Sequence, residues 1–139
     1  MRILVVDDSP GFLKAARFLL RQLGHEPVGL ARSGEEGLAM AAGLAPDVIL
    51  IDINMPGMDG VETTRRLKSQ PGSAPVIAIS FQSDSAFYSR CAAAGCDAFI
   101  PKADLAEALP RVLAHLLATG DGRRPGTAPA ATIAEFHDV

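Results

Sequence analysis

The sequence predicts an α/β fold in which a parallel sheet of five strands lies between helices. Short apolar runs rich in β-branched residues occupy positions 3–6, 48–51 and 75–80. Runs of this kind are typical of strands that are buried on both faces. Stretches with apolar residues at helical spacing separate these runs. Strands that alternate with helices in this way indicate a parallel sheet with right-handed crossovers.

The first helix and the strand that follows it can be placed from their end signals. Ser9 is a capping residue and Pro10 fits the first helical position, and apolar residues then recur at helical spacing. Residues 26–30 are expected to form the second strand. Because Pro27 and Gly29 weaken that strand, it is expected at an edge of the sheet.

The later elements are placed by the same signals. Ser33 and Glu36 form a capping box for a helix that is expected to run to about residue 42. The elements expected beyond the third strand are a helix from Asp59 to about Ser69, a helix started by Ser83 and Asp84, and a strand at 97–101. Proline breaks a helix interior, so the last helix is expected to begin shortly before Pro110, with a turn at 104–106.

Length and composition limit the classes of protein. The chain has 139 residues, of which 48% are hydrophobic and 21% charged, which suits one globular domain. Residues 1–118 are expected to form that domain, and 119–139, rich in Gly, Pro and Ala, a flexible tail or a truncated linker. The net charge of −3 gives no electrostatic footprint for direct nucleic-acid binding.

Location follows from what the first residues and the cysteines indicate. No apolar run approaches the roughly 20 residues that a membrane-spanning helix needs, so no membrane association is predicted. The chain enters its first strand at once and shows no signal-peptide pattern. A cytoplasmic location with reduced Cys91 and Cys96 thiols is therefore expected.

Carboxylates follow two of the predicted strands. Asp7 and Asp8 come directly after the run at 3–6, and Asp52 ends the run at 48–51. If these strands are neighbours, the three carboxylates meet at one edge of the sheet, where open α/β sheets bind ligands. Carboxylates that close repel one another unless a cation neutralises them. An all-oxygen cluster favours a hard divalent ion, and Mg²⁺ is the common cellular choice.

Four separated elements, in order, carry a resemblance to a known family. They are Asp7-Asp8, Asp52 with Met55-Pro56-Gly57-Met58-Asp59-Gly60, Ser80 as the last residue of the fourth strand at 75–80, and Lys102 in Phe99-Ile100-Pro101-Lys102. On these residues the chain resembles the receiver domain of two-component response regulators, over roughly residues 1–118. The resemblance implies a doubly wound (βα)5 fold of the CheY-like, flavodoxin-like kind, with strand order 2-1-3-4-5.

The resemblance also implies a chemistry for the strand ends. Asp52 would accept a phosphoryl group from a sensor histidine kinase or a phosphotransfer protein. Asp8, Asp52 and the backbone carbonyl of Asn54 would ligate Mg²⁺, and Asp7 would hold a metal-bound water. The ammonium of Lys102 would reach Asp52 and later a phosphoryl oxygen. The domain is expected to be a phosphoacceptor and not a turnover enzyme.

Two further residues would transmit the signal. By resemblance, phosphorylation draws Ser80 inward and Phe99 rotates into the space that it leaves. The face made by the fourth helix, the fifth strand and the fifth helix would change shape, as a population shift between two packings. That face would control a protein partner or an output domain, and it is also where a homodimer is expected.

Phe81 and the residues around Lys102 depart from the family pattern. The residue after Ser80 is usually small because it borders the phosphorylation site, and a bulky Phe81 would restrict access for donor, phosphatase or water. Proline precedes Lys102 here, as Pro101, where many receivers have it at the position of Ala103. Receivers attached to certain helix-turn-helix regulators also resemble the form found here, in which the proline precedes the lysine.

Three alternatives are weighed against the receiver. A receiver-like interaction module that takes no phosphate is motivated by Phe81. A Mg²⁺-dependent phosphohydrolase of the haloacid-dehalogenase kind would need a second aspartate where Ser9 stands, and a cap domain. Flavin binding is disfavoured because the loop after the first strand is acidic, which is wrong for a phosphate group.

Overall fold

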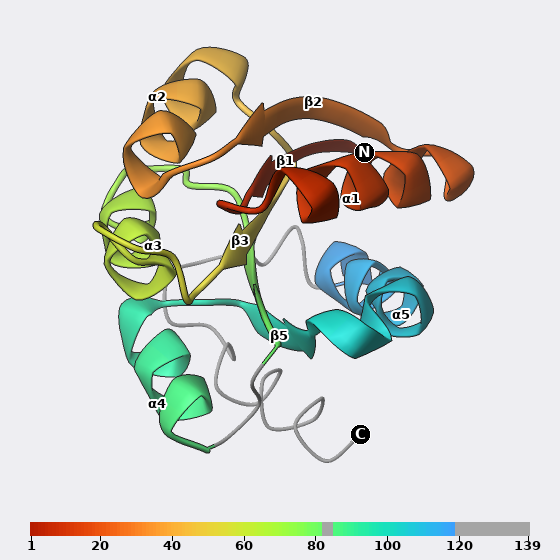
Figure 1. The fold of residues 1–139 in the computed structure, drawn as a ribbon. Helices are drawn as coiled ribbons and strands as arrows, with labels where there is room; N and C mark the ends of the chain where they lie inside the picture. Colours follow the sequence, from red (N-terminus) through yellow and green to blue (C-terminus); the bar gives the residue numbers. More distant parts are fainter. Residues whose placement is uncertain (82–84, 119–139) are drawn as a thin grey trace.

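A computed structural model describes residues 1–81 and 85–118 of the chain (Figure 1). Five strands and five helices alternate along it, with one short 3-10 helix before the last helix. The strands are β1 (Arg2–Val6), β2 (Glu26–Ala31), β3 (Val48–Asp52), β4 (Val76–Ser80) and β5 (Ala98–Pro101). The helices are α1 (Pro10–Gln22), α2 (Gly34–Leu44), α3 (Gly60–Lys68), α4 (Ser85–Ala94), η1 (Lys102–Asp104) and α5 (Leu105–Ala118).

All neighbouring strands run parallel, and their order is β2-β1-β3-β4-β5. This confirms the predicted doubly wound fold. The weak strand β2 lies at an edge, as its proline and glycine predicted. The chain reverses its direction of winding between β1 and β3, so the carboxyl ends of these two strands flank the switch point where such sheets bind ligands.

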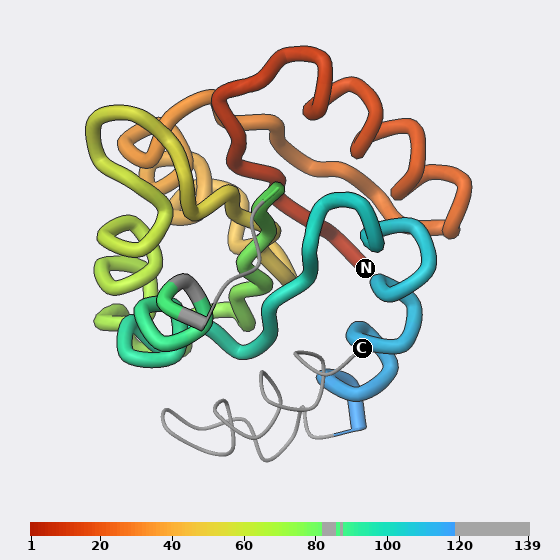
Figure 2. Tube along the Cα trace, turned by 60° about the horizontal axis from the view of Figure 1, so that its bottom comes forward, coloured from red at the N-terminus to blue at the C-terminus, as the bar shows by residue number. Residues whose placement is uncertain are grey.

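Two hydrophobic cores cover the two faces of the sheet. Helices α1 and α5 lie on one side and α2, α3 and α4 on the other, in both views (Figures 1 and 2). Alternate residues of the strands feed the two cores, so that in β3 Leu50 faces α1 and α5 while Ile49 and Ile51 face the other helices. Burial on both faces explains why these strands are unbroken apolar runs.

Polar caps begin three of the helices where the sequence predicted them. The hydroxyl of Ser9 accepts a hydrogen bond from the backbone of Phe12, and Pro10 takes the first helical position of α1. The Ser33 hydroxyl and the Asp59 carboxylate cap α2 and α3 in the same way. Each cap satisfies a backbone N–H that the helix itself leaves unpaired.

The start of the last helix was predicted wrongly. Helix α5 begins at Leu105, directly after η1, and Pro110 lies inside it. Pro110 is on the exposed face, so water can solvate the carbonyl that its missing N–H leaves without a helical partner. The opposite face buries Leu105, Leu109 and Val112, and this burial outweighs the cost of the proline.

Some expectations fall on residues that are not described. The predicted helix start at Ser83 and Asp84 and the predicted tail at 119–139 both lie outside the described residues. Within residues 1–81 and 85–118, no helix is long and apolar enough to cross a membrane. Cys91 and Cys96 are both free and buried.

Candidate phosphotransfer site

The fold brings the three predicted carboxylates together. Strands β1 and β3 pair in parallel with Val6 opposite Ile51, which sets Asp7 and Asp52 side by side at the carboxyl edge of the sheet. Oxygen atoms of Asp7, Asp8 and Asp52 lie within 4.8 Å of one another. Asp7 and Asp52 are buried, whereas Asp8 is exposed. The pocket therefore opens to solvent on the side of Asp8.

Backbone amides hold the two buried carboxylates in place. Oδ1 of Asp7 accepts a hydrogen bond from the backbone N–H of Ser9 at 2.8 Å. Oδ1 of Asp52 accepts one from the backbone N–H of Asn54 at 3.0 Å. In each residue the second oxygen is turned toward Lys102, so each carboxylate is oriented by its own loop and faces the pocket.

Lys102 enters the pocket from the first residue of η1, at the end of β5. Its Nζ is 2.6 Å from Oδ2 of Asp7 and 3.3 Å from Oδ2 of Asp52. Its side chain is only 3% exposed. The lysine was expected to reach Asp52, and the structure places it there, but its shorter contact is with Asp7.

The carboxylate cluster carries more negative charge than Lys102 can neutralise. Burial raises the pKa of Asp7 above its ordinary value, and the nearby Asp52 charge adds to the rise. The Lys102 ammonium and the Ser9 amide act in the opposite direction without cancelling it. Charged carboxylates are therefore held at a cost in this pocket, which a further cation would relieve.

The donors of the pocket fit a hard divalent cation. Three carboxylates from two loops each offer an oxygen at a common point, and no softer ligand joins them within the described residues. Oxygen donors with excess negative charge are what Mg²⁺ selects. The residues thus fit the metal that the sequence implied, with Asp7, Asp8 and Asp52 as the side chains that would hold it.

Ser80 and Phe99 lie between the pocket and the face of α4, β5 and α5 that was predicted to change shape, called the switch face below. Both are fully buried. Ser80 ends β4 and pairs with Pro101 of β5, one residue before Lys102. The ring of Phe99 packs on that of Tyr88 from α4, with centroids 4.2 Å apart. The structure thus holds Phe99 in an inward position, in contact with the helix whose displacement the resemblance implies.

Two aromatic rings flank Lys102, and one of them was not predicted. Nζ of Lys102 is 4.4 Å from the ring centroid of Phe12 on α1 and 4.5 Å from that of Phe81. Phe81 was expected to border the site, and it does so by lying against the lysine. Phe12 is one of the apolar residues that recur at helical spacing after Pro10. No local signal marks it further, since its contact with Lys102 depends on how α1 is rotated against the sheet.

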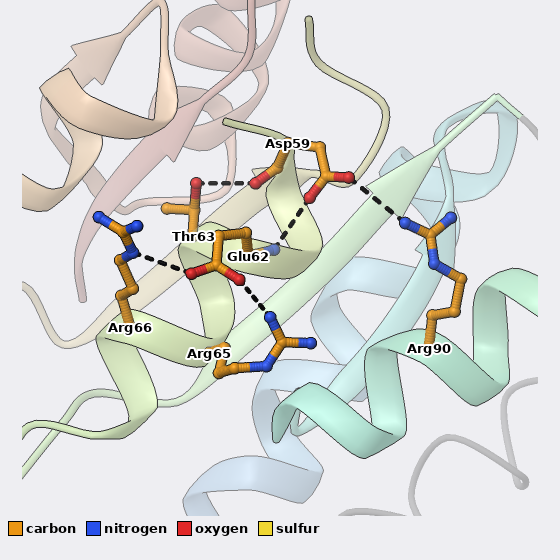
Figure 3. Close-up of polar contacts among 6 residues, drawn as sticks. All are labelled: Asp59, Glu62, Thr63, Arg65, Arg66 and Arg90. Carbon is orange, nitrogen blue, oxygen red and sulfur yellow. Dashed lines mark hydrogen bonds and ion pairs between the residues drawn. The ribbon is translucent and has the colours of Figure 1, made fainter. Parts of the chain in front are cut away.

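The loop between β3 and α3 is fixed at its far end by Asp59 (Figure 3). The Asp59 carboxylate accepts from the backbone of Glu62, its carbonyl accepts from the Thr63 hydroxyl, and it pairs with Arg90 of α4 at 3.3 Å. The carboxylate of Glu62 pairs in turn with Arg65 and Arg66. This network ties the loop that follows Asp52 to the helix of the predicted switch face.

Gly60 allows the same loop to fold back against the strand that carries Asp52. A Cβ atom at Gly60 would lie 2.2 Å from the carbonyl oxygen of Asp52 and 2.4 Å from Cα of Ile53. Only a residue without a side chain leaves room for that approach. Gly60 therefore sets the position of α3 relative to Asp52, a role that its place in the family motif did not explain.

Comparisons with known proteins agree with this architecture. A family model described as the response regulator receiver domain matches residues 3–113. The response regulator GacA of Pseudomonas viridiflava is 38% identical over 109 residues, which cover 77% of this chain and 51% of that protein. The chain spans about half the length of the curated relatives that it matches first.

Solved structures match over most of the chain. A LuxR-family two-component response regulator from Aurantimonas sp. SI85-9A1 superposes with a TM-score of 0.79 and 28% identity, covering 99% of this chain and 98% of that one. The CheX-CheY-BeF3-Mg²⁺ complex from Borrelia burgdorferi gives a TM-score of 0.74 and 26% identity, covering 84% of this chain and 89% of that one.

Proposed function

The chain belongs to the receiver domains of two-component response regulators, and on that premise we propose that it accepts a phosphoryl group on Asp52. The observation that carries the proposal is the convergence of Asp7, Asp8 and Asp52 around one point, with the Lys102 ammonium 3.3 Å from Asp52. The donor would be a sensor histidine kinase or a phosphotransfer protein.

The transfer is a displacement at phosphorus. A carboxylate oxygen of Asp52 forms a bond to phosphorus as the bond from phosphorus to the donor nitrogen or oxygen breaks, and the donor leaves with the electron pair. The Asn54 amide orients the carboxylate. Lys102 loses Asp52 as its partner when that carboxylate becomes an acyl phosphate, and it would then pair with a phosphoryl oxygen. The Ser80 hydroxyl is proposed to contact another phosphoryl oxygen.

Charge neutralisation decides whether this displacement proceeds. Bound Mg²⁺ would supply positive charge to the phosphoryl oxygens and to the attacking carboxylate. We assign Asp8, Asp52 and the Asn54 carbonyl as its direct ligands, with Asp7 holding a metal-bound water. The excess of carboxylates over the single Lys102 ammonium supports a bound cation, and the division between direct ligands and the water-holding Asp7 follows the family resemblance.

The output is proposed to be a change in the face formed by α4, β5 and α5. Ser80 and Phe99 lie on adjacent strands between the pocket and α4, and the Phe99 ring contacts Tyr88 of that helix. Movement of Ser80 toward the phosphoryl group would shift the balance between two packings of Phe99. The face would then bind a protein partner, an output domain or a second copy of the chain.

The direct test is intact mass after incubation with acetyl phosphate and Mg²⁺. We expect one phosphoryl adduct on the wild-type protein, and none on Asp52→Asn or in a metal-free control. Asp97→Asn is the matched control, since Asp97 lies in a separate ion pair with Lys68, and it should be phosphorylated like the wild type.

A missing adduct would have to be separated from a poor small-molecule donor. Mg²⁺ would then be titrated with beryllofluoride, which mimics the phosphoryl group. Failure of both would reject the phosphoacceptor role and favour a receiver-like interaction module that takes no phosphate. A phosphohydrolase is not favoured, because the hydroxyl of Ser9, at the position where that chemistry needs an aspartate, caps α1.

A further inference from the structure

Two cysteines meet where α4 ends. Gly95 follows the helix with a φ of 102°, a left-handed conformation that glycine adopts without strain. The N–H of Gly95 donates to the carbonyl of Ala92 at 3.1 Å, and the N–H of Cys96 donates to the carbonyl of Cys91 at 3.0 Å. This pair of hydrogen bonds is a Schellman motif, in which the two outermost side chains commonly contact each other. In this chain those two side chains are the thiols of Cys91 and Cys96.

The geometry of the turn suits a disulfide bond. The hydrogen bond from Cys96 to Cys91 keeps their Cα atoms within about 7 Å of each other, the upper end of the range that a disulfide spans. The two thiols are in hydrogen-bonding contact, and this contact together with burial raises the pKa of the Cys96 thiol well above its ordinary value. Both residues are 0% exposed. The folded backbone thus already holds the two cysteines at a separation that a disulfide can bridge.

The same two cysteines connect α4 to a fixed part of the sheet. Cys91 lies on α4, and Cys96 lies in the segment that enters β5. That segment is held just beyond Cys96, because the N–H of Asp97 donates to the carbonyl of Val76 at 2.8 Å and its carboxylate pairs with Lys68. A bond between the two sulfur atoms would therefore add a covalent link to the aromatic contact that already joins α4 to β5.

We propose that Cys91 and Cys96 are a redox-active pair that closes to a disulfide and so fastens α4 to the segment that enters β5. The structure shows the reduced pair, since both cysteines are free. In the oxidised protein α4 would be held in the packing seen here, with Phe99 against Tyr88. Formation of the disulfide stands on the geometry of the turn, whereas its effect on the switch face rests on the phosphotransfer function proposed above.

The reaction is a two-electron oxidation by hydrogen peroxide. The thiolate of one cysteine attacks a peroxide oxygen, the O–O bond breaks, and a sulfenic acid and a hydroxide ion form. The thiolate of the other cysteine then attacks the sulfenic sulfur, so that the S–S bond forms as the S–O bond breaks and a second hydroxide leaves. The two thiol protons neutralise the two hydroxides. Two thiols and one peroxide thus give one disulfide and two water molecules.

Burial decides when this reaction can begin. Peroxide reacts with the thiolate, and both the full burial of the pair and the raised pKa of Cys96 disfavour that form in the folded protein. Local opening of the last turn of α4 would expose the pair to peroxide. The pair is therefore protected while α4 is closed on the sheet, and a disulfide formed during an opening is shielded from reductants once the helix closes again.

The first test measures whether the disulfide prefers the folded state. Dilute protein is equilibrated with mixtures of reduced and oxidised dithiothreitol, in native buffer and in concentrated urea, and intact mass after alkylation counts the free thiols. The turn holds the cysteines together, whereas the unfolded chain has to close that loop, so the equilibrium constant for disulfide formation should be about tenfold larger in the folded protein. An equal or smaller constant in the folded protein would overturn the proposal, because the native turn would then resist the bond.

The second test measures whether the bond restrains the switch face. Beryllofluoride with Mg²⁺, which mimics the phosphoryl group, is titrated by calorimetry into reduced and into peroxide-oxidised protein. If α4 has to leave its present packing, the oxidised protein should bind about fivefold more weakly, and dithiothreitol should restore the affinity. Cys91→Ala is the matched control, because it keeps the four methionines but cannot form the bond, so peroxide should leave its affinity unchanged.

The outcomes separate the redox pair from the phosphotransfer function. A disulfide that prefers the folded state, together with weaker beryllofluoride binding that dithiothreitol reverses, supports the proposal. Equal binding by reduced and oxidised protein overturns the restraint on α4 and leaves the proposed function standing. Reduced protein that takes neither a phosphoryl group nor beryllofluoride overturns the proposed function, and the restraint with it, while the redox equilibrium still decides whether the disulfide belongs to the fold.

Discussion

The sheet carries a lysine–aspartate pair at each end, and the two pairs are built differently. At the amino ends of β4 and β5, Lys68 pairs with Asp97 at 2.9 Å. The same Asp97 oxygen also accepts from the backbone N–H of Val76, and Lys68 donates to the carbonyl of Ala74. One cation therefore meets one anion, and backbone groups complete the set.

The pair at the carboxyl ends of the strands is not balanced in this way. There Lys102 meets Asp7 and Asp52 at once, and Asp8 stands beside them. The Asp7 and Lys102 side chains are 0% and 3% exposed, against 24% and 15% for Asp97 and Lys68. A balanced, half-buried pair suits a structural link. Buried excess charge at the point where the sheet reverses its direction of winding instead favours a ligand-binding site.

The largest expected effect is on Mg²⁺ binding. Asp8→Asn removes one charge from the cluster while its exposed position leaves the core untouched, so the Mg²⁺ affinity should fall about 100-fold. Asp97→Asn should leave that affinity unchanged. Calorimetric titration of both variants measures it. Equal loss in the two variants would mean that the ion binds by general surface charge and that the two ends do not differ.

The next effect concerns the backbone that supports Asp52. Gly60→Ala forces a Cβ atom against the Asp52 carbonyl, which should cost about 2–3 kcal/mol of stability, because backbone atoms cannot move aside as a side chain can. Gly43→Ala in α2 meets nothing within 4 Å and should instead stabilise by up to about 1 kcal/mol. Urea unfolding of the two variants gives both values.

A result against this prediction would be a Gly60→Ala protein as stable as the wild type. The loop between β3 and α3 would then be able to move away from Asp52 at no cost. In that case Asn54, whose amide orients the Asp52 carboxylate, would not be held by the packing of α3, and the phosphorylation rate of Gly60→Ala should match the wild type as well.

The part of the site that is close to the strands could be predicted from the sequence. Asp7, Asp8 and Asp52 follow apolar runs that have few alternatives to buried parallel strands, and neighbouring strand ends must meet at one edge. The sheet order was implied by the family resemblance and is confirmed by the structure, whereas the caps of α1, α2 and α3 follow from equally local signals. Their geometry is set by hydrogen bonds between near neighbours in sequence.

The rest depends on how elements pack, which no short stretch encodes. The contact of Phe12 with Lys102 depends on the rotation of α1, and the approach of Gly60 to Asp52 depends on the tilt of α3. The start of α5 was misjudged because Pro110 was weighed by its local rule alone, while burial of the opposite helix face decided the outcome. The proposed roles of Ser80 and Phe99 stay predictions.

A smaller effect is expected at the balanced pair of Lys68 and Asp97. Asp97→Asn weakens the link to Lys68 and the hydrogen bond that Val76 donates, so it should destabilise the protein by about 1.5 kcal/mol, after allowance for partial exposure of the pair. Urea unfolding at neutral pH measures the change, and added Mg²⁺ should not alter it. If Asp97→Asn were as stable as the wild type, the Asp97 carboxylate would contribute no more to stability than an amide oxygen does.

The smallest effect is expected to have the opposite sign. Asp7→Asn in metal-free protein should raise stability at pH 7 by about 1 kcal/mol, because it removes a buried charge from a cluster already rich in charge. The pKa of Asp7 is raised by burial above its ordinary value of 3.8, so the folded state holds this proton more tightly than the unfolded chain does. Stability of the wild type therefore falls as the pH rises from 3.8 through the folded-state pKa.

The gain in stability of Asp7→Asn over the wild type should shrink as the pH is lowered toward that ordinary pKa. In saturating Mg²⁺ the wild type should become the more stable protein, because the ion stabilises only a protein that binds it. Urea unfolding across the acid range, with and without Mg²⁺, measures both trends. If Asp7→Asn instead destabilised the metal-free protein as Asp97→Asn does, the contact of Lys102 with Asp7 would be a structural link like the one at the other end of the sheet. The excess charge of the pocket would then be no argument for a cation.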